Sequence, residues 1–151
     1  MKKVIVIAVI TACFIVGLCF AADAVTPESY SSAKKESVHF LENNRDGLEK
    51  TAAELLNKGE DAIGEYNKHD YSYLSDQGFV RFDIDAQGML GGQYWSLVYT
   101  SDGTFFGEAE KYLYEEASAE SGGNNIVIAE KIDGRWWFYW IDYDGTDRSY
   151  K

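Results

Sequence analysis

The strongest structural signal in this chain is an Asp-Gly pair, Asp133 and Gly134, between two runs of apolar and aromatic residues. Both central residues of a type I′ hairpin turn need positive φ, which Asp and Gly adopt readily. Residues 126–132 and 135–143 are therefore predicted to pair as antiparallel strands around this turn. A two-residue loop also predicts the register of the pair, because it places residue 132 opposite residue 135.

This register predicts that one face of the last strand belongs to a core. Side chains alternate between the two faces of a strand, and residues directly opposite each other share a face. One face then carries three large rings opposite two small residues: Trp136, Phe138, Trp140, Val127 and Ala129. We assign this face to a core covered by helices, since small residues leave room for large rings.

The other face of the same hairpin is predicted to be apolar as well. It carries Trp137, Tyr139 and Ile141 opposite Ile126 and Ile128. A sheet that is covered on one side only should be polar there. This second face is therefore either buried by further folding of the sheet or left apolar for a partner, and the sequence leaves both alternatives open.

The second alternative predicts a ligand-binding surface formed by Trp137, Tyr139 and Tyr143. On that interpretation, truncating Trp136 or Trp140 to alanine should cost about 3–5 kcal/mol of stability, as emptying a packed aromatic site does. Truncating Trp137 should cost far less stability and should weaken binding instead.

The rest of the chain divides into a helical half and an aromatic half. Of the 21 aromatic residues after position 24, 18 follow residue 70, which predicts that this half is a sheet. Strands are predicted at 78–85, 93–100 and 111–117, in addition to the two strands of the hairpin. Turn residues such as those at 87–88 and 101–103 separate them.

The N-terminal half is predicted to be helical between about 27 and 66. Thr26, Pro27 and Glu28 are typical of a helix start. Asp46 and Glu49 have the spacing of a capping box, which would begin a second helix after an interruption at 43–47. One kinked helix over the same range fits the pattern equally well.

The first residues have the layout of a secretory signal peptide. Lys2 and Lys3 precede the apolar stretch 4–22, and small residues, Ala22 and Ala24, stand three and one before the expected cleavage point. Cleavage after residue 24 would leave one domain of 127 residues, exported to the periplasm or the extracellular space. An uncleaved membrane anchor formed by residues 4–22 is the alternative.

Charge and cysteine content limit the classes of partner and the sources of stability. The net charge of −11 becomes −12 without the leader, which makes nucleic acids and anionic membrane surfaces poor partners. Cys13 and Cys19 both lie in the leader, so disulfides are not expected in the mature domain.

Signals for catalysis and for metal binding are weak. Residues 83–88 match the first half of a calcium loop, but the twelfth position is Tyr94 where that loop needs Glu. Asp142, Asp144 and Asp147 are weak metal candidates that a solvated tail explains equally well. We therefore expect no cofactor, no metal and no enzymatic activity.

Two segments resemble parts of known families. Residues 78–88 resemble an early strand and turn of extracellular Cache sensor domains, although the second membrane segment of that family is not found in these 151 residues. Residues 131–143 resemble the closing hairpin of nuclear-transport-factor-2-like domains. Residues 94–103 and 124–143 are similar to segments of small exported bacterial proteins of unknown role. These resemblances imply a small-ligand domain at most, and they transfer no site residue.

The sequence thus predicts an α+β domain, with one kinked or two N-terminal helices packed on a four- or five-stranded antiparallel meander. The expected function is an exported, non-catalytic binding module whose aromatic sheet face takes a glycan or a peptide. The alternative is a structural or inhibitory protein that docks on another protein of the cell envelope. The ligand, the partner and the oligomeric state are not readable from the sequence.

Overall fold

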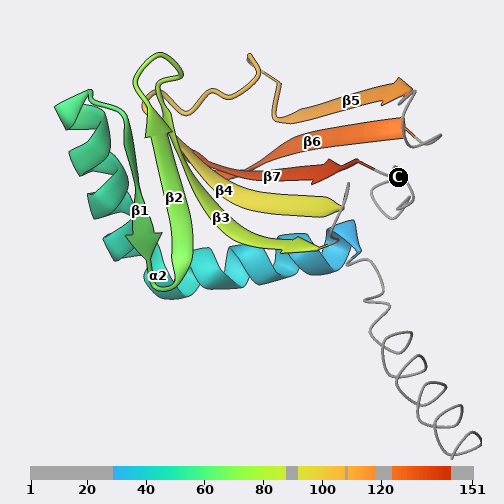
Figure 1. The fold of residues 1–151 in the computed structure, drawn as a ribbon, viewed down its shortest axis with the longest axis horizontal. Coiled ribbons are helices and arrows are strands. Elements are labelled where there is room, and N and C mark those ends of the chain that lie inside the picture. Colours follow the sequence, from blue (N-terminus) through green and yellow to red (C-terminus); the bar gives the residue numbers. More distant parts are fainter. Residues whose placement is uncertain (1–28, 88–91, 108, 118–123, 144–151) are drawn as a thin grey trace, which may run out of the picture.

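The computed structural model describes residues 29–87, 92–107, 109–117 and 124–143. The predicted leader, the predicted helix start at residues 26–28, and Asp144 and Asp147 lie outside these residues. In the part that is described, one helix is followed by a seven-stranded antiparallel sheet, which confirms the α+β class. The helix runs along one face of the sheet and its last turns rise beside strand β1 (Figure 1).

Helix α2 (Tyr30–Lys58) is continuous through the segment where an interruption was one of the two predictions. The Asn43 and Asn44 amides donate to the carbonyls of His39 and Phe40 one turn earlier, at 2.9 Å each, so these side chains fit within the helix. The helix ends at Lys58, not near residue 66, because Gly59 takes φ 65° and its N–H donates to the carbonyl of Leu55. No helix among the described residues is both long enough and apolar enough to cross a bilayer.

Two strands occupy residues that were predicted to lie at the end of the helix and just after it. Strands β1 (Ala62–Tyr66) and β2 (His69–Leu74) form a hairpin. Its two turn residues, Asn67 and Lys68, both have positive φ, 49° and 69°. That backbone is the one a type I′ turn requires. The prediction of a helix here was wrong because the tight turn overrides the helical spacing of the apolar residues.

The other five strands occur where the sequence predicted strands. They are β3 (Phe79–Gln87), β4 (Gln93–Thr100), β5 (Lys111–Ala117), β6 (Asn124–Asp133) and β7 (Trp136–Asp142). The sheet order is β1-β2-β3-β4-β7-β6-β5. The predicted four- or five-stranded meander is therefore corrected to seven strands, in which β7 pairs with β4 and β5 forms the far edge (Figure 1).

The last hairpin has a register one residue away from the predicted one. A bulge between Lys131 and Asp133 places Lys131 opposite Trp137 and Ala129 opposite Tyr139. A bulge inserts one extra residue into one strand, so every β6 side chain before it changes its partner. The inner rings of β7 were predicted correctly, but their neighbours on β6 are Ile126 and Ile128. Val127 and Ala129 face the other way.

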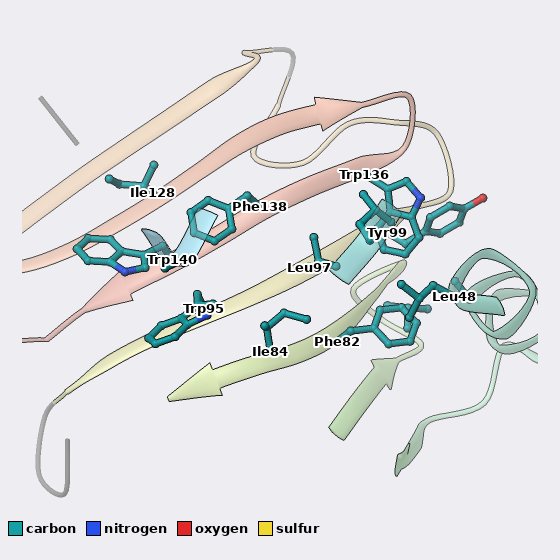
Figure 2. Packing of buried hydrophobic residues seen from close by; sticks show 14 of the residues in the cluster. Leu48, Phe82, Ile84, Trp95, Leu97, Tyr99, Ile128, Trp136, Phe138 and Trp140 are labelled. Atoms are coloured by element: carbon teal, nitrogen blue, oxygen red, sulfur yellow. The ribbon is translucent and has the colours of Figure 1, made fainter. Parts of the chain in front are cut away.

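The helix-covered face holds the main core. Figure 2 shows aromatic and aliphatic side chains of strands β3, β4, β6 and β7 gathered on this face, with Leu48 of the helix beside Phe82. Trp95, Trp136 and Trp140 each expose about 1% of their surface or less. The indole of Trp136 donates to Glu49 at 3.1 Å, which ties this core to α2. Apolar packing and the hydrogen bond between Trp136 and Glu49 thus attach the helix to the sheet.

Ion pairs attach α2 to the strands near its N-terminus and at its middle. Tyr30 donates a hydrogen bond to Glu130, and the ammonium of Lys34 lies 2.8 Å from the same carboxylate. Burial raises the pKa of Glu130, but the hydrogen bonds from Lys34 and Tyr30 outweigh it, so its pKa lies below the usual range. Arg45 holds Asp133 of the hairpin turn at 2.7 Å. These contacts hold α2 against one face of the sheet.

Candidate functional site

The second face of the sheet is partly covered by the segment between β4 and β5. Phe105 packs against the indole of Trp137 with ring centroids 6.0 Å apart, over Val98 and Ala129. Trp137 is only 1% exposed. This face is therefore a second, smaller core where it meets residues 101–107, and it is open beyond that segment.

The covering segment has an unusual backbone at Phe106. Its φ of 54° is rare for a bulky residue, and the glycines on either side of the phenylalanine pair, Gly103 and Gly107, also have positive φ. The ring of Phe106 stacks on Tyr112 at 4.6 Å and 10°, yet 47% of the residue remains exposed. A strained residue of this kind costs on the order of 1–3 kcal/mol and is found mainly at functional sites. The strain makes this segment a candidate for function.

A groove of about 620 Å³ lies between this segment and strands β3 and β4; we call it the outer groove. Its lining combines four aromatic residues with charged and polar ones, among them Phe79, Phe105, Phe106, Tyr139, Arg81 and Asp102. The groove lining begins in the turn before β3, at Gln77 and Gly78, and continues along β3 to Arg81. An apolar cleft with a few convergent polar groups is the usual form of a small-ligand site.

An ion pair lies at the Tyr139 end of the outer groove. Arg81 Nε is 2.8 Å from Asp83 Oδ1, and the hydroxyl of Ser96 donates to the same oxygen at 2.9 Å. Burial raises the pKa of the Tyr139 phenol, as does nearby Tyr143, while the charge of Arg81 acts in the opposite direction. The phenol therefore stays protonated at neutral pH and can donate a hydrogen bond.

The other end of the outer groove carries Asp102. This carboxylate accepts hydrogen bonds from the backbone N–H and the hydroxyl of Thr104, at 2.9 and 2.8 Å. Both bonds lower the pKa of Asp102, so it remains ionised at neutral pH. The two ends of the groove thus offer different charged groups, with aromatic rings between them.

The three residues predicted to bind ligand lie in three different environments. Tyr139 lines the outer groove. Trp137 lies in the second core beneath Phe105, where its 1% exposure keeps it from touching a ligand directly. Tyr143 is 41% exposed and packs edge-on against Tyr94, at 6.4 Å, outside the groove lining. Only one of the three is placed at the groove.

The carboxylates considered for metal binding do not meet in the described structure. Asp83 is engaged by Arg81 and Ser96, and Asp85 accepts from the neighbouring N–H of Ala86. Asp142 is buried at the end of β7. Within the described ranges, no group of three His, Cys, Asp or Glu side chains is arranged to hold a metal ion.

Sequence reasoning did not identify Phe105, Phe106 or Arg81 as site residues. The local signal for the first two is a pair of adjacent phenylalanines between Gly103 and Gly107, in a segment too short and too rich in turn residues to be a strand. Its meaning depends on where the segment folds, because the same pair in an open loop would bury nothing.

Comparison of the chain with protein-family models, with curated proteins and with solved structures finds no match. No family assignment therefore follows, and the function has to be inferred from the outer groove itself.

Proposed function

We propose that this protein is a non-catalytic binding module whose outer groove receives a glycan or a peptide. The observation that carries the proposal is the groove lining, which combines the rings of Phe79, Phe105, Phe106 and Tyr139 with the charged side chain of Arg81. Rings offer flat apolar surface, and the charged and hydroxyl groups offer directional hydrogen bonds. Binding is preferred to catalysis because the Asp83 carboxylate already pairs with Arg81 and Ser96, which leaves it poorly suited to act as a base.

Replacing Tyr139 with alanine tests this proposal. The variant should bind a glycan or peptide ligand about tenfold more weakly, because it loses a ring contact and a phenol donor at the groove. Isothermal titration calorimetry with oligosaccharide and peptide panels would measure the affinity. Tyr94→Ala is the control, since Tyr94 is likewise a tyrosine on a strand but does not line the groove.

Equal loss of affinity in the Tyr139 and Tyr94 variants would place binding elsewhere on the surface. A protein that bound no member of either panel would contradict the module proposal and favour the alternative, a structural or inhibitory partner of another envelope protein.

We also propose that the module is exported, which the leader-like residues 1–24 support. Mass spectrometry of the protein from its native host should find a mature chain that begins at Val25. A mass that includes the whole leader would favour the anchored alternative, in which residues 4–22 hold the domain at the membrane.

A further inference from the structure

We propose that the ligand of the outer groove is a neutral carbohydrate chain, with Phe106 as the stacking ring and the Arg81–Asp83 pair as its polar clamp. This inference rests on the function proposed above and narrows it to one ligand class. Four features of the groove support it: the backbone beneath it, its charge, its free donors and acceptors, and its exposed ring.

The backbone beneath the groove is already used by the sheet. Strand β3 pairs with β2 and β4, and β4 pairs with β3 and β7, so both strands are paired on both sides. An extended peptide that binds by strand addition needs a free sheet edge. Strands β3 and β4 therefore offer only their side chains to the groove, and a ligand recognised through its own rings and hydroxyls suits them better than a peptide backbone does.

The charges at the groove favour a neutral ligand. Arg81 and Asp83 neutralise each other through two contacts, 2.8 Å at Nε and 3.4 Å at Nη2. An anionic ligand would be repelled by Asp83, by Asp102 and by a chain of net charge −11. Arg81, the one Lys or Arg in the described groove lining, already pairs with Asp83, so a cationic ligand would have to compete with it for that carboxylate. A neutral ligand leaves the ion pair intact.

The ion pair still has hydrogen-bonding capacity on its outer side. Arg81 Nη1 has no acceptor among the described residues, and the only described donor to Asp83 Oδ2 is the Nη2 group at 3.4 Å. A sugar hydroxyl both donates and accepts, so two neighbouring hydroxyls match one free donor beside one free acceptor. Tyr139, which stays protonated, adds a third polar contact at the same end.

Phe106 supplies the flat surface. Stacking on Tyr112 and, at 6.0 Å and 24°, on Tyr139 holds its ring in place while nearly half of the residue stays exposed. The strained backbone at this residue is consistent with a ring positioned for contact rather than for burial. The groove's volume of about 620 Å³ exceeds that of a single sugar ring, which favours a chain of sugars.

The experiment compares five probes of three classes on one protein. Calorimetry would be run with neutral hexasaccharides of glucose, of mannose and of N-acetylglucosamine, with a hexasaccharide of galacturonic acid, and with an uncharged hexapeptide. At least one neutral hexasaccharide should bind. Phe106→Ala and Arg81→Met should each weaken that binding about tenfold. Tyr94→Ala, outside the groove, should leave it within about twofold.

Thermal melts would show that the variants are folded, and Asp83→Asn provides a second test of the clamp if Arg81→Met is unstable. Suppose that only the uronic acid or only the peptide binds, and that the same groove variants weaken this binding. That result would overturn the inference of a neutral carbohydrate ligand and leave the binding-module proposal standing. Absence of binding by every probe, or binding that no groove variant weakens, would overturn both.

Discussion

Replacing Trp137 with alanine is expected to lower the free energy of unfolding by about 3–5 kcal/mol, as much as replacing Trp136 does. Both indoles are 1% exposed, although they point to opposite faces of β7. Removing either ring leaves a cavity between packed neighbours, which for Trp137 are Val98, Phe105 and Ala129. Chemical denaturation followed by circular dichroism would measure the loss for both variants.

A second variant separates packing from polarity at this position. The indole nitrogen of Trp137 is buried and has no acceptor among the described residues. Trp137→Phe keeps a ring in the cluster and removes that donor, so it should cost much less than Trp137→Ala. A loss below about 1 kcal/mol for Trp137→Ala would mean that Phe105 does not cover the indole in solution. The face of β7 that carries Trp137 would then be open to a ligand, as the predicted binding surface of Trp137, Tyr139 and Tyr143 requires.

Replacing Leu48 with alanine is expected to cost about 2–5 kcal/mol. Leu48 is fully buried and joins α2 to the rings of β3 and β7 (Figure 2). It lies in the continuous helix directly after residues 43–47, where the sequence allowed an interruption. Urea denaturation would measure the effect, with the m-value as a check on two-state unfolding.

The matched control for Leu48 is Glu54→Ala, on the exposed side of the same helix. It should change stability by less than about 0.5 kcal/mol, since alanine is a good helix former and no core contact is removed. Similar effects at the two positions would contradict the packing of α2 against the sheet.

Two strands were predicted to the residue. Strand β4 lies at Gln93–Thr100, as the turn residues at 101–103 indicated, and β5 lies at Lys111–Ala117, although its glutamates would also have suited a helix. The hairpin at Asp133 and Gly134 is also present. By contrast, β1 and β2 were missed, because their turn residues, Asn67 and Lys68, are a weak signal until both are seen at positive φ. The helical spacing of Ala62 and Tyr66 competed with that signal.

The candidate site was predicted only in part. Tyr139 was placed on the correct face of β7, since alternation along a single strand is a local property. Its companions in the groove, Phe105 and Phe106, come from a segment whose position depends on contacts with residues far away in the chain. No spacing rule connects such residues before the chain has folded.

The sequence alone determined the class of the fold, the five C-terminal strands and the inner face of β7. These follow from turn chemistry and side-chain alternation, which act over a few neighbouring residues. The tertiary structure decided three further matters: the bulge at Lys131 that shifts β6 by one residue, the burial of Trp137, and the formation of the outer groove. Each depends on how distant segments pack together, and packing free energy is a property of the assembled neighbours rather than of any local pattern.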